Sequence, residues 1–337
     1  MGGGSWDTSA YYADTSARAA AGVSAFDYTD QVRSGRVTGI HPSLDPLNMK
    51  NPDPTRYAFP LRESRDSAEH PESIPIAMVF DVTGSMGAIP MMLQQKLARL
   101  MDVIIDKAGL KDPQILVGAV GDSNSDRYPF QVGQFESSNI FDEHLRNIIL
   151  EGNGGGQSKE SYALAYRFAA DHTATDAFEK RGKKGYFFTM GDEAPWPTVT
   201  AADVSRLFGV SAGEDETIES LIARASEQWE IFHLFALDGN YRHATDIHAR
   251  WRKLLGERLV MVEDSSLVCE IIAGIVHMIE NAYDADRVVT DIGLSGSAAA
   301  AVKNALVPVS GSSVVPRAGQ SGGALKRRAA QGGVSRV

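Results

Sequence analysis

The sequence predicts an α/β domain in which a doubly wound, mostly parallel sheet carries helices on both faces. From residue 74 to about 284, short apolar runs typical of buried strands alternate with longer runs that have an apolar stripe, as helices do. Such alternation favours parallel strands joined by helical crossovers. Polar motifs also follow apolar strands directly at residues 81 and 192. Doubly wound sheets bind their ligands at such strand ends, so the same pattern predicts a site.

The elements can be placed in order along the chain. The first strand, 76–80, is apolar and stops at Asp81, and Pro90 then opens a helix whose apolar stripe continues to residue 105. The other predicted strands are 114–120, its hairpin partner 128–132, 186–190, 229–237 and 259–262. The other predicted helices are 141–150, 161–170, 217–226, 241–255 and 265–283, the last of these closing the domain.

Two segments outside this domain differ in composition. Residues 1–73 show no sustained periodicity, apart from a possible short helix at 16–23, but contain aromatic clusters. We therefore expect an extended, partly disordered arm, part of which packs on the domain or on a partner. Residues 285–337 are rich in Gly, Ser, Ala and Val and have more basic than acidic residues, which predicts a flexible tail.

Composition narrows the class of protein. The chain has 337 residues and a formal net charge of −10, which disfavours a dedicated nucleic-acid binder because phosphate recognition requires cationic surface. The single cysteine, Cys269, lies among apolar residues and is expected to be buried in a reducing compartment. No signal-peptide pattern follows Met1 and no apolar stretch is long enough to span a membrane. We therefore expect a soluble cytoplasmic protein without a membrane partner.

Oxygen-bearing side chains cluster directly after the first strand. Asp81, Thr83 and Ser85 stand at alternate positions and are followed by an apolar-striped helix. One carboxylate and two hydroxyls at i, i+2 and i+4 can point into one crevice and offer only hard oxygen ligands. Mg²⁺ and Mn²⁺ prefer such ligands, so the motif predicts a divalent metal site.

The pattern Asp-x-Thr-Gly-Ser-Met after an apolar strand resembles the von Willebrand factor A domain family. In that family Asp-x-Ser/Thr-x-Ser opens the metal-ion-dependent adhesion site, and two further pieces follow in fixed order. The first, a glycine-rich loop with a polar ligand, matches Gly-Asn-Gly-Gly-Gly-Gln-Ser-Lys-Glu at 152–160. The second, an Asp just past another buried strand, matches Asp192. The resemblance covers residues 74–284 and implies a Rossmann-like fold.

The middle piece departs from the family pattern. Members usually place Thr there, or Asp in a Gly-Gly-Asp-x-Pro-Glu variant, whereas this chain has Gln157 beside Ser158. Either oxygen can ligate a cation, but neither adds negative charge, so we expect weak affinity in the free protein. For Ser158 an equally good interpretation is that it only caps the following helix.

The resemblance implies a non-catalytic binding module. Asp81, Thr83, Ser85 and Asp192, with Gln157 or Ser158, would hold Mg²⁺, Mn²⁺ or Ca²⁺, and a partner protein's carboxylate would complete the coordination. Intracellular relatives often work with AAA+ ATPases or in multi-protein assemblies, which suggests an assembly role here. Two alternatives stay open: a metal-dependent hydrolase, and a structural subunit whose metal site is degenerate.

Two other clusters receive a structural interpretation. His233 lies inside a predicted strand, and His243 and His248 are five residues apart, which disfavours a zinc site. Asp122, Asn124 and Asp126 have calcium-loop spacing but lack the Gly and distal Glu of an EF-hand. We interpret this second cluster as a turn near the metal site.

Overall fold

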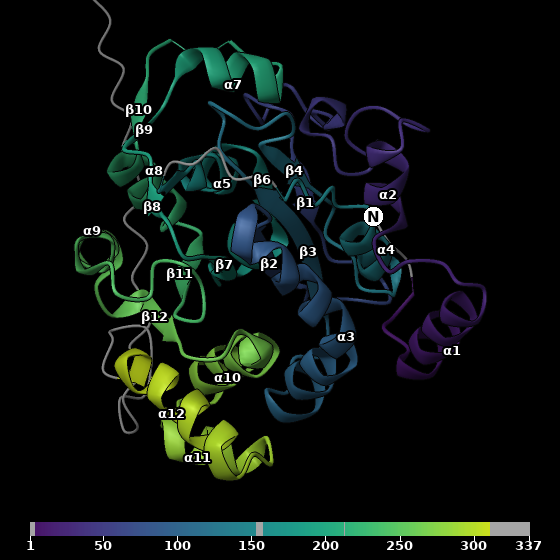
Figure 1. Cartoon of the computed structure of the whole chain (residues 1–337), viewed down its shortest axis with the longest axis vertical. Coiled ribbons are helices and arrows are strands. Elements are labelled where there is room, and N and C mark those ends of the chain that lie inside the picture. Colours follow the sequence, from purple (N-terminus) through teal and green to yellow (C-terminus); the bar gives the residue numbers. More distant parts are fainter. Residues whose placement is uncertain (1–3, 153–157, 212, 311–337) are drawn as a thin grey trace, which may run out of the picture.

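A computed structural model describes residues 4–152, 158–211 and 213–310 (Figure 1). Its centre is a six-stranded sheet with the order β12-β11-β7-β2-β3-β4. The strands are β2 (Ile74–Asp81), β3 (Pro113–Val120), β4 (Phe130–Val132), β7 (Gly185–Gly191), β11 (Trp229–Ala236) and β12 (Leu259–Val262). All neighbours pair in parallel except β3 and β4, which are antiparallel. The predicted mostly parallel sheet is confirmed, and its one antiparallel edge strand makes it mixed.

Helices cover both faces of this sheet, because its strands are apolar on both sides. All eight residues of β2 are buried, with Met78 and Phe80 in one core and Ala77 and Val79 in the other. The first core lies under α3 (Ala88–Asp102), its π-helical continuation η3 (Val103–Lys107), α4 (Ile140–Arg146) and α10 (Val268–Asn281). The second lies under α5 (Tyr162–Asp171), α7 (Ala201–Phe208), α8 (Ile218–Ala225) and α9 (Thr245–Leu255).

The order of the strands reverses at β2. From β2 the chain adds β3 on one side and later returns to add β7 on the other side. The carboxyl ends of β2 and β7 therefore flank the switch point, where α/β sheets leave room for a ligand.

The N-terminal arm is more helical than predicted. It contains α1 (Thr8–Ala20), α2 (Asp27–Arg33), η1 (Pro46–Asn48) and β1 (Arg62–Ser64), and β1 pairs with β6 (Thr173–Thr175). Tyr11, Phe26 and Leu44 of the arm are buried in the first core. Burial of these aromatic and aliphatic side chains explains why a segment without obvious periodicity is ordered.

Helix α2 is tied to the chain that enters the glycine-rich loop. The Thr29 hydroxyl donates to the carbonyl of Ile148 (2.9 Å) and accepts the N–H of Leu150 (3.0 Å). The Arg33 guanidinium donates to the carbonyl of Leu150 (2.7 Å). The arm thus fixes the backbone at residues 148–150.

The prediction of a flexible tail from residue 285 is wrong for its described part. Residues 285–310 form α11 (Ala285–Asp291) and α12 (Gly296–Ser310), so α10 is not the last helix. Val288, Val302 and Leu306 are buried in the first core. The alanine run of α12 favours a helix, and packing of both helices on the first core outweighs the flexibility suggested by the average composition. The expectation for residues 311–337 lies outside the described residues.

Several short elements of the domain had no counterpart in the prediction. They are α6 (Asp176–Arg181), α7, η2 (Gly84–Gly87), η4 (Gly256–Arg258), β5 (Lys159–Glu160), β6, β8 (Ala194–Pro195), β9 (Thr198–Val199) and β10 (Glu216–Thr217). The predicted helix 265–283 corresponds to η5 (Ser265–Leu267) followed by α10. In the part of the chain that the structure describes, no single helix is long and apolar enough to cross a membrane. Two consecutive helices, Ser265–Asn281 and Ala285–Asp291, are together long and apolar enough by length and composition alone, but they meet at an angle of 115°.

Candidate metal centre

The first predicted ligand lies at the end of the central strand. Asp81 is the last residue of β2 and is fully buried. Its Oδ1 accepts the backbone N–H of Thr83 (2.8 Å) and the Thr83 hydroxyl (2.7 Å), and its Oδ2 accepts the Tyr162 hydroxyl (3.2 Å). Burial raises the pKa of Asp81 to about 7, although the bonds from Thr83 oppose the shift.

The middle piece of the motif contributes a residue that the sequence analysis missed. Glu160, the second residue of β5, is buried, and its Oε1 lies 2.9 Å from the Thr83 hydroxyl. Its other oxygen, Oε2, is buried without a hydrogen-bond partner. Burial, followed by the charges of Asp81 and Glu193, raises the pKa of Glu160 to about 10. The sequence held a signal, since Glu160 stands where the Gly-Gly-Asp-x-Pro-Glu variant has its Glu.

Two more carboxylates follow the neighbouring strand β7. Asp192 is buried, and its Oδ2 accepts the backbone N–H groups of Asn240 (2.5 Å) and Tyr241 (3.3 Å). Glu193 is half-buried, and its Oε2 is buried without a hydrogen-bond partner. Burial, followed by the charge of Asp81, raises the pKa of Glu193 to about 8.

Close backbone packing brings these pieces together. A Cβ atom on Gly191 would lie 3.0 Å from the Cβ of Asp81, and one on Gly239 would lie 2.3 Å from the Oδ2 of Asp192. The charge of Asp192 contributes to the raised pKa of Asp81. The structure therefore brings Asp81, Thr83 and Asp192 together at the switch point of the sheet, and we call the place where they meet Glu160 and Glu193 the crevice. Their role as ligands stays a prediction.

The other predicted ligands are less well placed. Ser85 lies in the 3₁₀ turn η2, two residues beyond Thr83, and the structure describes only its backbone. Gln157 lies outside the described residues. Ser158 is exposed at the entry to β5. The interpretation of Ser158 as a helix cap is wrong, because α5 begins at Tyr162 and Ser161 holds the cap position.

The arm reaches this crevice through the backbone. The segment fixed by Thr29 and Arg33 continues to Gly152, whose N–H donates to the carbonyl of Val82 (3.4 Å). Val82 stands between Asp81 and Thr83 in the chain. The docked arm thus supports the loop that carries two of the predicted ligands.

The carboxylates and hydroxyls of the crevice are suited to bind a cation together. Within the described ranges, none of Asp81, Glu160, Asp192 and Glu193 forms an ion pair with a basic side chain, and two of their oxygens are buried without a partner. Unpaired buried carboxylates are costly, and a divalent cation would remove that cost. No group of three or more His, Cys, Asp or Glu among the described residues is placed to hold a metal alone. A cation here would therefore need hydroxyl and water ligands as well, a mixture that suits Mg²⁺.

The other clusters considered in the sequence have structural roles. Asp122 caps its own turn: its Oδ1 accepts the backbone N–H of Asn124 (3.1 Å) and the Trp196 indole N–H (2.9 Å). The His233 imidazole is buried in β11, stacks on Trp251 with 3.6 Å between ring centroids, and bonds the Thr189 hydroxyl. Neither cluster offers a metal site.

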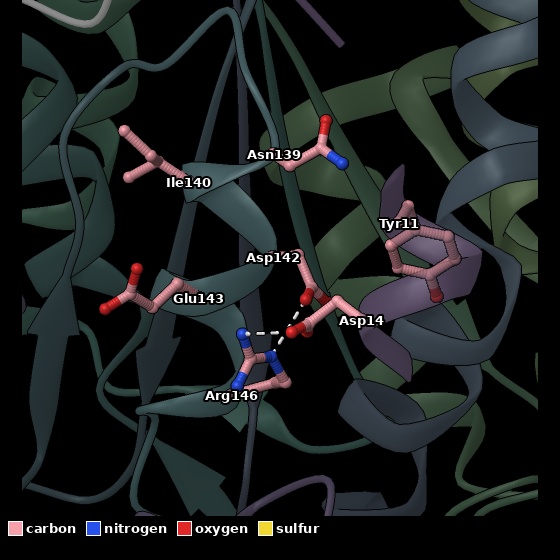
Figure 2. Close-up of a pocket in the computed structure, with 7 residues that line it drawn as sticks. All are labelled: Tyr11, Asp14, Asn139, Ile140, Asp142, Glu143 and Arg146. Carbon is pink, nitrogen blue, oxygen red and sulfur yellow. Dashed lines mark hydrogen bonds and ion pairs between the residues drawn. The ribbon is translucent and has the colours of Figure 1, made fainter. Parts of the chain in front are cut away.

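An acidic cavity of about 240 Å³ lies between α1 and α4 (Figure 2). It is lined by Tyr11, Asp14, Asn139, Ile140, Asp142, Glu143 and Arg146. Figure 2 shows Asp14 and Asp142 turned toward Arg146, which lies 3.7 Å and 2.8 Å from their carboxylates. Because these charges are paired, the cavity is explained by the docking of α1.

Comparisons with known proteins show only remote similarity. No known protein family matches the sequence, and no curated protein matches it. The pilus adhesin SpaC of Lactobacillus rhamnosus GG, in its open conformation, is similar with a TM-score of 0.41 and 8% identity, over 69% of this chain and 31% of that one.

Proximal thread matrix protein 1 from the mussel byssus is similar in two structures. One has a TM-score of 0.37 and 9% identity, over 59% of this chain and 46% of that one. The other, with a zinc-occupied MIDAS motif, has a TM-score of 0.35 and 10% identity, over 63% and 47%. The chain spans less than half of each of these structures. At such low TM-scores the similarity carries no argument, and the α/β architecture rests on the sheet itself.

Proposed function

We propose that this protein is a non-catalytic interaction module that binds a carboxylate of a partner protein through a divalent cation. Asp81, Thr83 and Ser85 hold the cation, Asp192 orients its water ligands, and Glu160 takes the place expected for Gln157 or Ser158. A coordination position is left for the partner. The cation joins two acidic surfaces that would otherwise repel each other.

The observation that carries this proposal is the buried, unpartnered Oε2 of Glu160. Its carboxylate lies against Thr83, which itself bonds Asp81, at the switch point of the sheet. Buried polar atoms are nearly always hydrogen-bonded or ligated, so an unpartnered carboxylate oxygen beside two further candidate ligands supports a cation-binding role for this site.

The identity of the cation and of the partner is part of the proposal. Oxygen ligands favour Mg²⁺, Mn²⁺ or Ca²⁺ over softer metals. Zn²⁺, a softer metal that also accepts nitrogen and sulfur ligands, is titrated in parallel as a comparison. A partner in a cytoplasmic assembly, such as an AAA+ ATPase, is the expectation that follows from the family resemblance.

Isothermal titration of each cation into wild type and Asp81→Asn tests the site. Wild type is expected to bind, and the variant to lose most of its affinity, because it keeps the side-chain shape but loses the charge. Asp106→Asn, at an exposed carboxylate of η3, is the matched control and should bind as wild type does. Absence of binding to wild type would instead favour a degenerate site.

A screen for phosphatase and esterase turnover tests the non-catalytic part. No turnover is expected. Metal-dependent turnover that disappears in Asp81→Asn would favour the hydrolase alternative.

A further inference from the structure

The rim of the crevice carries positive charge on the side of β5. Successive residues of a strand point to opposite sides, so buried Glu160 is preceded by exposed Lys159. Strand β5 pairs with β8, which brings Trp196 alongside. The ammonium nitrogen of Lys159 lies 4.6 Å from the centroid of the Trp196 ring, within the range of a cation–π interaction.

Trp196 is a fixed support for this charge. Its indole N–H donates to the Oδ1 of Asp122 (2.9 Å), and its backbone N–H donates to the carbonyl of Glu160 (3.0 Å). Within the described ranges Lys159 has no carboxylate partner. Its charge therefore stays available at the edge of the crevice.

The loop after β11 also borders the crevice. The backbone N–H of Tyr241 bonds Asp192. Arg242 follows Tyr241, is exposed, and forms no ion pair with any described residue. Two basic side chains without an ion pair among the described residues thus lie beside the crevice, Lys159 on β5 and Arg242 in the loop after β11.

We propose that Lys159 and Arg242 bind the partner beside the cation, and that the partner site is therefore an acidic segment with several neighbouring carboxylates. This inference rests on the proposed function and specifies its partner. One carboxylate completes the metal coordination, and its neighbours pair with Lys159 and Arg242. The chain has a net charge of −10, which repels an acidic partner, so local positive charge at the rim is needed to guide it to the crevice.

Two fluorescein-labelled peptides test this inference by anisotropy in the presence of Mg²⁺. One has six consecutive Glu, and the other has a single Glu among Gln residues. Wild type should bind the first about tenfold more tightly, since two exposed ion pairs together reach that order. Lys159→Gln and Arg242→Gln should each reduce this preference, and the double variant should abolish it. Binding of Mg²⁺ and of the single-Glu peptide should stay unchanged.

Lys253→Gln, at an exposed lysine in the last turn of α9, is the matched control and should keep the preference. Equal binding of both peptides by wild type would overturn the inference. So would a double variant that behaves like the control. If Asp81→Asn, or wild type without Mg²⁺, binds the peptides as tightly as wild type with Mg²⁺, the proposed function is contradicted instead. Failure of the inference and failure of the proposed function therefore give different results.

Discussion

The docking of the N-terminal arm can be tested with one nearly isosteric substitution, Thr29→Val. Thr29 is 2% exposed, and its hydroxyl bonds the carbonyl of Ile148 and the N–H of Leu150. Valine keeps the shape of the side chain but leaves both backbone groups without a partner. Each buried polar group left unpaired costs about 1–3 kcal/mol, so with two such groups the free energy of unfolding should fall by about 2–6 kcal/mol.

Urea unfolding, followed by far-UV circular dichroism, measures this loss. Thr290→Val is the matched control, because Thr290 is exposed on α11 and bonds only the carbonyl of Asp286 in its own helix. The control should stay within about 0.5 kcal/mol of wild type. A Thr29→Val protein as stable as the control would refute the docking of α2 on residues 148–150.

Three further predictions concern the backbone, the pH and the crevice. Ala282→Gly should raise the free energy of unfolding by about 1 kcal/mol in urea titrations, because Ala282 ends α10 with a φ of 54° that glycine adopts freely; an unchanged or lower value would contradict this. Burial lowers the pKa of His172 to about 4. The neutral, buried imidazole therefore contributes fully to the free energy of unfolding above pH 6.5, and about 3 kcal/mol of that free energy is lost as the pH falls toward 4. In urea titrations at several pH values, the free energy of unfolding of His172→Gln should depend less on pH than that of wild type. An equal pH dependence in the two proteins would rule this out. Gly239→Ala should weaken Mg²⁺ binding at least about tenfold in calorimetry, because its Cβ would displace Asp192, whereas Gly213→Ala, which meets open space, should not. Equal affinity of the two glycine variants would show that the position of Asp192 does not matter.

The sheet was predictable because its strands are buried on both faces. Continuous apolar runs such as 76–80 and 259–262 stand out in the sequence, and a polar residue marks where they stop. The observed strands β2 (Ile74–Asp81) and β12 (Leu259–Val262) agree with these predictions to within two residues. The convergence of Asp81 and Asp192 followed from the topology, since both end neighbouring parallel strands.

The missed features depend on tertiary contacts. The match of Glu160 to the Glu of the Gly-Gly-Asp-x-Pro-Glu variant is a signal in the sequence, but its burial depends on the pairing of β5 with β8. A strand of two residues has no periodicity from which that burial could be predicted. Helices α11 and α12 were missed because their alanines and valines resemble a linker in average composition. Their order comes from packing on α10, which the sequence does not display locally.

The backbone link from α2 to Val82 has a thermodynamic consequence. Thr29 and Arg33 hold residues 148–150, and Gly152 of the same segment bonds the peptide between Asp81 and Thr83. Because the docked arm holds the backbone that carries the predicted ligands, cation binding and arm docking are expected to be energetically coupled. Such coupling is reciprocal. A ligand that detaches the arm would then release the cation, and a chelator would make the arm easier to detach.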